Sequence, residues 1–245
     1  MTADSPLKDH RSVWDNKPVL RAIYDDYHRY ILGALGEDGP ILDIGAGSGH
    51  FRQMSDQIVS LDILPAPWVD VAGAAEALPF ADGSIAGIAM LDVLHHLPSP
   101  MTFFNEAKRV LKPGGRIAMI EPGITPLSWC FFHYLHQEDV DMSVDPTADQ
   151  PPHVAEDPFA SNQGLPTLLF SRARHRDRFL SRVPELTVRE RRWLSLWAYP
   201  LSGGFKAWSL IPASLVPSIL AVEKCVLPML GPLMGFRLAV VLERS

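Results

Sequence analysis

The segment ILDIGAGSGH, from Ile41 to His50, constrains the fold more than any other part of the chain. Its first residues are mostly apolar and predict a short buried strand that ends near Asp43 and Gly45. Three glycines then stand at alternate positions, which predicts a tight turn from the strand into a helix over residues 48–56. Bare backbone of this kind lets N–H groups approach a bound molecule closely, so we expect a nucleotide-like ligand here.

The segments that follow alternate between strand-like and helix-like patterns. A helix is predicted over residues 101–111, where it stops at the KPGG turn. Further strands are predicted over residues 57–63, 68–73, 84–91 and 116–122. This alternation requires crossover connections and predicts an α/β fold with a parallel sheet, in which ligands bind at the carboxyl ends of the strands.

The glycine pattern and its neighbouring carboxylates indicate which ligand to expect. A dinucleotide-binding turn has the pattern GxGxxG, whereas this chain has GxGxG followed by His50. Asp43 would repel a pyrophosphate but attract the ammonium group of an amino acid. Asp62, at the end of the next strand, is placed to accept hydrogen bonds from the two hydroxyls of a ribose. A ribose, a cationic amino-acid tail and no phosphate together describe S-adenosylmethionine.

Five segments, in order and spacing, resemble the motifs of the class I S-adenosylmethionine-dependent methyltransferases, of the small-molecule, type 11-like kind. They are ILDIGAGSGHF, VSLDI, AAEALPF, AMLDVLHHLPSP and EAKRVLKPGGRIAMIEP, and the resemblance covers roughly residues 40–122. It implies a Rossmann-like seven-stranded sheet, mostly parallel with an antiparallel last strand, with helices on both faces and lid insertions. Residues 186–200 and 235–245 would supply the last two strands.

The resemblance also implies roles for individual residues. Asp62 would bind the ribose hydroxyls, Ile63 would pack on the adenine, and Ala75 and Glu76 would stand beside the adenine edge. The methionine moiety would be held by Asp43, Gly45, Ala46, Gly47, Ser48 and Gly49, and the floor of the transfer site would be lined by Leu91 and Asp92.

Some of these roles have alternatives. Many relatives have an acidic residue where this chain has Ala74, so the backbone of Ala75 is expected to make the adenine contact instead. Asp92 also fits as a helix cap, and Glu76 as a solvated loop carboxylate.

Two adjacent histidines are the candidates for catalysis. His95 and His96 directly follow the fourth strand, where a base could reach an acceptor that must lose a proton. Packing and capping are the alternative role for each. If one of them is the base, the sequence favours His96 narrowly.

We expect a single methyltransferase domain with four parts. Residues 1–39 would form an N-terminal helical cap, from which Tyr24 or Tyr27 reaches the cofactor or joins the core. The other parts are a cofactor-binding core over 40–122, an insertion or lid over 123–185, and the last two strands over 186–245.

The last part contains an apolar insertion, residues 201–234, which several prolines interrupt. It is interpreted as a face for a homodimer, an element that contacts a membrane surface, the wall of a pocket for an apolar acceptor, or core packing. We favour an apolar or lipid-like small-molecule acceptor.

Composition and residue spacing disfavour several other kinds of partner, location and site. A formal net charge of −6 disfavours a nucleic-acid partner. The two cysteines provide no disulfide framework, and the first residues lack the pattern of a signal peptide, so a cytoplasmic location, with membrane association through 201–234, is expected. His133, His136 and Glu138 match no standard ligand spacing, so no metal is expected.

Two further hypotheses come from other classes. The first is an NAD-dependent oxidoreductase, which the missing third glycine and Asp43 disfavour. The second is a catalytically silent protein that keeps the cofactor fold and acts through partner binding.

Overall fold

The computed structural model describes residues 6–36, 38–134, 139–148 and 160–245. The helices are α1 (Pro6–Asn16), α2 (Pro18–Leu35), α3 (Pro100–Val110), α4 (Pro126–Tyr134), α5 (Leu165–Ser171), α6 (Ala173–Arg182), α7 (Ala198–Ser202) and α8 (Val216–Met234). The strands are β1 (Ile41–Ile44), β2 (Ile58–Asp62), β3 (Val71–Ala72), β4 (Ile85–Leu91), β5 (Leu111–Pro122), β6 (Leu186–Leu194) and β7 (Arg237–Arg244). Three short 3₁₀ helices are η1 (Phe51–Met54), η2 (Leu94–His96) and η3 (Ala213–Leu215).

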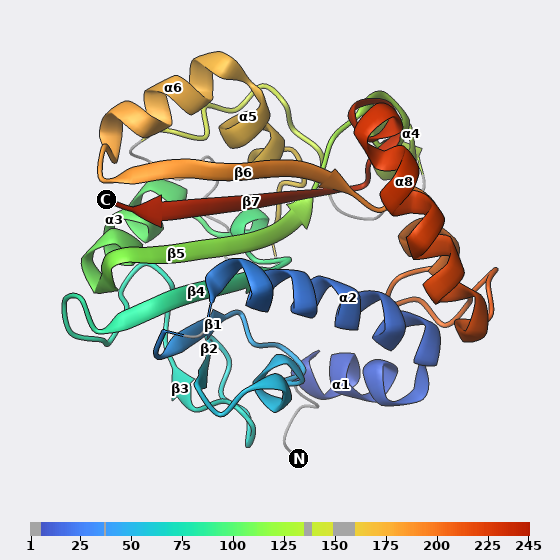
Figure 1. Cartoon of the computed structure of the whole chain (residues 1–245), viewed down its shortest axis with the longest axis horizontal. Helices are drawn as coiled ribbons and strands as arrows, with labels where there is room; N and C mark the ends of the chain where they lie inside the picture. The colour runs from blue at the N-terminus through green and yellow to red at the C-terminus, as the bar shows by residue number, and fades with distance from the viewer. Residues whose placement is uncertain (1–5, 37, 135–138, 149–159) are drawn as a thin grey trace.

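The strands form one mixed sheet in the order β3-β2-β1-β4-β5-β7-β6 (Figure 1). The first five strands in this order run parallel to one another, and β7 runs antiparallel to both of its neighbours. The predicted seven-stranded, Rossmann-like fold with an antiparallel last strand is therefore confirmed. The strand order reverses between β1 and β4, because the chain continues from β1 to β2 and β3 on one side and from β4 to β5 on the other. Open α/β sheets bind ligands at such a point.

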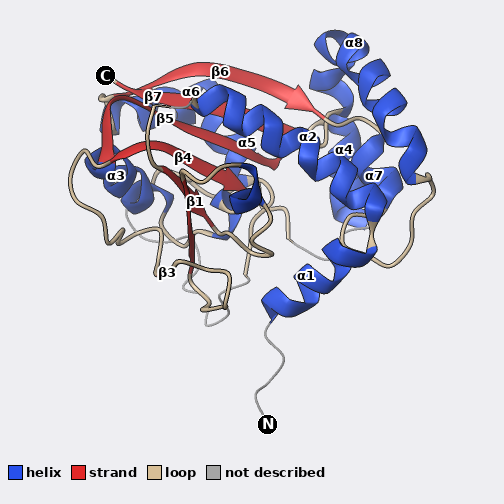
Figure 2. Ribbon diagram, turned by 60° about the horizontal axis from the view of Figure 1, so that its bottom comes forward, coloured by secondary structure: helices blue, strands red, loops and turns tan. Residues whose placement is uncertain are grey.

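Each face of the sheet is covered by its own group of helices, as predicted. On one face, Leu42 and Ile44 pack with buried aromatic residues of α3, α5 and α6. On the other face, Ile41 packs with apolar residues of α2 and α8. Successive residues of a strand point to opposite faces, so β1 contributes to both layers. Figure 2 shows α4, α7 and α8 gathered at one end of the sheet, and Figure 1 shows that β5 ends there.

The prediction of a helix over residues 48–56 is wrong. Gly45, Gly47 and Gly49 all have positive φ, at 70°, 51° and 75°, and only the four residues of η1 follow them as a 3₁₀ turn. Ser55 is already extended. The glycine loop therefore offers a ligand its own curved backbone and not the N-terminus of a long helix.

Both predicted insertions contain helices. Residues 123–185 include α4, α5 and α6, and Arg178 on α6 forms an ion pair of 2.5 Å with Asp145. In residues 201–234 the prolines do not end the helix, because Pro228 and Pro232 lie within α8.

Candidate active site

A cavity of about 630 Å³ lies at the carboxyl ends of β1 and β4. Of the predicted site residues, those in its wall are Asp43, Gly45, Ala46, Gly47, Ser48, Leu91, Asp92, His95 and His96. The fold thus brings together Asp43, the glycine loop, the end of β4 and both histidines, which the sequence places up to 53 positions apart. The predicted residues that do not line this cavity are Gly49, Asp62, Ile63, Ala75 and Glu76.

Asp43 is the most unusual group in the cavity wall. Its side chain is buried, with the residue 6% exposed, and Oδ2 has no hydrogen-bond partner among the residues that the structure describes. Burial, reinforced by the nearby charge of Asp62, raises the pKa of Asp43 to about 8. A buried carboxyl without a partner is costly, so this position fits a ligand that supplies a positive charge and hydrogen-bond donors.

Asp62 acts on the glycine loop from outside the cavity. One carboxylate oxygen accepts a hydrogen bond of 2.9 Å from the backbone N–H of Gly47, and the other accepts one of 2.9 Å from Leu64. Asp62 therefore fixes the path of the loop. Its predicted contact with ribose hydroxyls would use the remaining lone pairs of the same oxygens.

The three residues assigned to the adenine occupy different surroundings. Ile63 is exposed, Ala75 is buried and Glu76 is half-buried. Oε1 of Glu76 is buried without a hydrogen-bond partner in the described part of the chain, and burial raises the pKa of this carboxyl. Glu76, whose alternative role was a solvated loop carboxylate, is thus only partly exposed to solvent.

Trp68 and Arg11 also hold the glycine loop, and neither has a motif that would have revealed it. The indole Nε1 of Trp68 donates a hydrogen bond of 2.8 Å to the carbonyl of Gly47. A Cβ at Gly49 would lie 2.3 Å from the Trp68 ring, so glycine is needed at this position. Arg11 lies over the Trp68 ring at 4.4 Å and donates to the carbonyl of Ser48.

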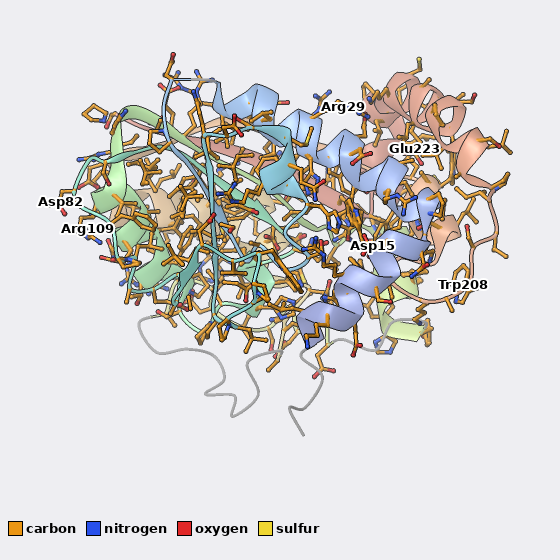
Figure 3. All side chains as sticks on the ribbon, turned by 90° about the horizontal axis from the view of Figure 1, so that it is seen from below. Asp15, Arg29, Asp82, Arg109, Trp208 and Glu223 are labelled. Carbon is orange, nitrogen blue, oxygen red and sulfur yellow. The ribbon has the colours of Figure 1, made fainter. Side chains whose placement is uncertain are left out.

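The N-terminal helix covers the loop from the side of the cavity. Trp14 of α1 stacks on His50 with ring centroids 4.6 Å apart, and Asp15 lies 3.3 Å from the same imidazole. Figure 3 shows α1, with Asp15 labelled, on the same side of the molecule as Trp208 of a second covering segment. The helical cap predicted for residues 1–39 thus includes residues that line the cavity, among them Tyr24.

The second covering segment, residues 203–208, is tied to the N-terminal helices by one buried ammonium group. Lys17, between α1 and α2, donates to the backbone carbonyls of Gly204, Lys206 and Trp208. Burial lowers its pKa. We refer to α1 together with residues 203–208 as the cover of the cavity.

Asp92, which is half-buried, and Arg237, which is buried, form an ion pair in the cavity wall. Asp92 has a φ of 60°, which is uncommon outside glycine, and accepts a hydrogen bond of 2.9 Å from the Tyr24 hydroxyl. Its other oxygen pairs with Arg237, which is 2% exposed and lies 4.0 Å from the ring of Tyr199. The alternative role of Asp92 as a helix cap is wrong, because no side chain caps η2 from that position.

Glu121 performs the capping that was considered for Asp92, and it also holds His95. Its Oε1 accepts hydrogen bonds from the backbone N–H groups of Val93 and Leu94, at 2.9 and 2.8 Å. Its Oε2 lies 2.7 Å from Nδ1 of His95. Both residues are buried. When Nδ1 donates to Glu121, the other ring nitrogen of His95 holds the lone pair that a general base requires.

No cluster of three potential metal ligands occurs among the described residues. His133 stacks on Trp129, whereas His136 and Glu138 lie outside the described residues.

Residues 42–119 match the model of a family described as a methyltransferase domain. This match covers about a third of the chain, and the strand order with its antiparallel β7 is that of the Rossmann-like methyltransferase fold. The matched residues extend from β1 into β5 and therefore include the glycine loop and both histidines.

Three comparisons describe what the chain is similar to. A demethylmenaquinone methyltransferase of Renibacterium salmoninarum is 29% identical over 128 residues, which are 44% of this chain and 54% of that protein. The chain spans about half the length, or less, of the first curated relatives it matches. A geranyl diphosphate C-methyltransferase from Streptomyces coelicolor, solved with S-adenosyl-L-homocysteine, has a TM-score of 0.53 at 14% identity, covering 91% of this chain and 79% of that one. A methyltransferase from Archaeoglobus fulgidus has a TM-score of 0.54 at 15% identity, covering 92% and 94%. At these identities the two solved structures show a shared fold.

Proposed function

We propose that this protein transfers a methyl group from S-adenosylmethionine to a small molecule. The single observation that carries the proposal is the buried, unpartnered Oδ2 of Asp43 in the cavity beside the glycine loop. The ammonium group of the methionine moiety would supply both the charge and the donors that this carboxyl lacks. The matching family and the cofactors named for its structural neighbours support the same assignment.

The predicted cofactor residues keep their proposed roles around that contact. Gly45, Ala46, Gly47, Ser48 and Gly49 would shape the loop that holds the methionine moiety. Asp62 would take the ribose, Ile63, Ala75 and Glu76 would surround the adenine, and Leu91 and Asp92 would line the transfer site. When bound, S-adenosylmethionine supplies an electrophilic methyl group on a sulfonium. The protein then needs to align the acceptor and exclude water.

The base for an acceptor that must lose a proton is proposed to be a histidine of the pair 95–96. The hydrogen bond from His95 to Glu121 supports His95, because the carboxylate fixes the ring and stabilises the imidazolium that forms. His96, the narrow preference from sequence, lies in the same wall with its ring 4.2 Å from that of His95.

The acceptor is proposed to be apolar or lipid-like. Aromatic side chains from two parts of the chain line the cavity, namely Phe131 and Phe132 of α4, and Phe205 and Trp208 of residues 203–208. Such walls bury the apolar surface of a bound molecule. Contact with a membrane surface through residues 201–234, and a homodimer formed there, remain the two predictions for partners.

The experiment that tests the proposal is calorimetric titration with S-adenosylmethionine, S-adenosylhomocysteine and NADH, on the wild type and on Asp43→Asn. Asn keeps the size of Asp43 and removes its charge. We expect the wild type to bind the first two ligands and the variant to bind them about tenfold or more weakly, as for the loss of a charge-assisted hydrogen bond. The control is Asp82→Asn, at an exposed position, which should bind as the wild type does.

The same titration has a pH dependence that follows from Asp43. Because burial raises its pKa to about 8, the carboxyl is mostly protonated at pH 7 and must release its proton to pair with an ammonium. Affinity should therefore rise from pH 6 to pH 8, and this rise should vanish in Asp43→Asn. Unaltered affinity in the variant would overturn the assignment of the site. Binding of NADH alone would favour the oxidoreductase hypothesis, and binding of none of the three would favour the silent protein.

A further inference from the structure

The outer surface of α8 is apolar, although a helix on the outside of a protein ordinarily presents polar residues there. The residues of α8 that are exposed are Pro217, Ser218, Ala221, Val222, Lys224, Cys225, Pro228, Met229, Pro232 and Leu233. Only Ser218 and Lys224 among them are polar, and Met229 is 80% exposed. An apolar surface of this length requires a partner that is itself apolar.

Neighbouring segments extend this surface. Exposed Leu127, Trp129 and Tyr134 lie on α4, and exposed Trp208, Leu210 and Leu215 precede α8. Helices α4 and α8 lie side by side in both views (Figures 1 and 2) and are in contact. We call these exposed residues of α4, of α8 and of 208–215 the α4–α8 face. Tryptophan and tyrosine among aliphatic residues are typical of the boundary between a membrane and water.

The exposed charges of this region are positive. Residues 201–234 contain three charged side chains, Lys206, Glu223 and Lys224. Glu223 is buried and accepts hydrogen bonds from the backbone N–H groups of Trp197 and Ala198, which leaves the two lysines at the surface. In a chain with a net charge of −6, this positive edge is suited to anionic lipid headgroups.

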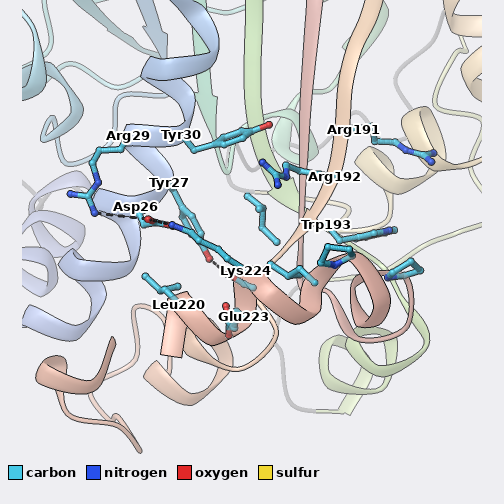
Figure 4. Close-up of a pocket in the computed structure, with 15 residues that line it drawn as sticks. Asp26, Tyr27, Arg29, Tyr30, Arg191, Arg192, Trp193, Leu220, Glu223 and Lys224 are labelled. Carbon is cyan, nitrogen blue, oxygen red and sulfur yellow. Dashed lines mark hydrogen bonds and ion pairs between the residues drawn. The ribbon is translucent and has the colours of Figure 1, made fainter. Parts of the chain in front are cut away.

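A second cavity, of about 740 Å³, adds to this positive edge (Figure 4). It lies between α2, β6 and α8 and is lined by Arg29 and Arg192 as well as Lys224. Asp26 pairs with Lys224 at 2.7 Å and approaches Arg29 at 4.0 Å, so one carboxylate faces two cations there. These long side chains can reach phosphate groups beside the α4–α8 face.

Helix α8 is long and apolar enough to cross a membrane, but its packing favours a position along the surface. The apolar helical segment spans residues 213–234, and most of its residues are not buried. Its inner side is fixed to the rest of the fold at two places. Glu223 accepts hydrogen bonds from the backbone at the start of α7, and Gly231 lies so close to Trp193 of β6 that an added Cβ would be 2.7 Å away. A helix held along one side and apolar along the other lies in the interface plane.

The α4–α8 face adjoins the candidate active site. Phe131 and Phe132 of α4, together with Trp208, line the 630 Å³ cavity, while Leu127 and Trp129 of the same helix are exposed. We propose that the α4–α8 face docks on the surface of an anionic lipid bilayer, which places the cavity beside the apolar phase. Docking itself is independent of the proposed function, and only the delivery of an apolar acceptor from the bilayer rests on it.

The test is flotation of the full chain with vesicles of phosphatidylcholine, with and without a fraction of phosphatidylglycerol. We expect binding to the anionic vesicles and weaker binding to the neutral ones. The triple variant Val222→Ser, Met229→Ser, Leu233→Ser should bind about tenfold or more weakly, because each replacement removes apolar area that would enter the interface. The variant Lys224→Gln should lose part of the preference for phosphatidylglycerol.

Matched controls separate this surface from general effects. Met54→Ser replaces an exposed methionine on η1, and Arg174→Gln removes an exposed cation on α6, so both should float as the wild type does. Binding of S-adenosylhomocysteine by the triple variant shows that it is folded and keeps failure of docking distinct from failure of the proposed function. If the protein does not bind anionic vesicles, or if the triple variant binds equally well, the proposal is overturned. A dimer in light scattering that the triple variant converts to a monomer, without vesicle binding, would assign the face to a second copy of this chain.

Discussion

The two sides of the candidate active site are held in place by different kinds of contact. The floor is formed by the ends of β1 and β4, which belong to the hydrogen-bonded ladder of the sheet, and by the residues that directly follow them. The cover, α1 with residues 203–208, is attached through a few side chains, chiefly Lys17, Arg11 and Trp14. Ladders inside a core open only with the whole domain, whereas segments held by a few side chains open at lower cost. The cavity therefore combines a fixed reacting surface with a cover that can separate from it.

The largest expected loss of stability comes from replacing Arg237, which pairs with Asp92 in the floor of the cavity. In Arg237→Met the carboxylate of Asp92 keeps the Tyr24 hydroxyl but loses its buried counter-charge. Breaking a buried pair costs about 3–5 kcal/mol, and we expect the lower end because the Asp92 side chain is 24% exposed. Urea unfolding measures this loss. The control Arg174→Met, at an exposed site on α6, should change stability by less than about 0.5 kcal/mol. A loss as small as that of the control would mean that the pair does not hold the floor.

A smaller loss of stability is expected from Gly49→Ala, at the position where Trp68 packs against the glycine loop. Gly49→Ala and Gly83→Ala place a Cβ at similar positive φ values, 75° and 61°, so both variants incur backbone strain of about 1 kcal/mol. At Gly83 nothing lies within 4 Å of the new Cβ, whereas at Gly49 the Trp68 ring lies 2.3 Å away. Gly49→Ala should therefore cost about 2 kcal/mol or more in thermal unfolding. Equal losses in the two variants would show that Trp68 moves aside freely.

The smallest effect on global stability is expected from releasing the cover. Lys17→Met removes the ammonium that binds the carbonyls of residues 204, 206 and 208, at a net cost of about 1 kcal/mol. Hydrogen exchange is the sharper measurement: amides of residues 204–210 should exchange about fivefold faster, while those of β1 and β4 stay protected. Lys8→Met, at an exposed site on α1, is the control. Faster exchange throughout β1 and β4 would show that floor and cover open as one unit.

The parts of the floor that the sequence predicted are those set by local pattern. Short apolar runs located the strands, and the glycines with Asp43 located the turn, because strand burial and positive φ depend on neighbouring residues. The helix after that turn was predicted from the same local view and is wrong. The Trp68 ring, nineteen positions beyond Gly49, packs against the loop, and the backbone is already extended at Ser55.

The residues that the sequence did not reveal act over long separations. Arg237 joins Asp92 from 145 positions away, and Lys17 holds carbonyls that are 187 to 191 positions away. Neither has a distinctive spacing, because an ion pair between two strands or a lysine beside a loop is specified by topology alone. Glu121 lay at the end of a predicted strand, but only the fold shows that it reaches back to residues 93–95.

The two oxygens of Glu121 have a consequence for the proposed methyl transfer. One oxygen accepts a hydrogen bond from the backbone after β4, and the other orients His95. The position of the imidazole is therefore set by the sheet and not by α1 or residues 203–208. The cover can then open to admit one molecule and release another without displacing the group proposed to take the proton. Each reaction cycle would begin with the imidazole of His95 already oriented. Entry and release of molecules through the cover, and not movement of the base, would then limit the rate.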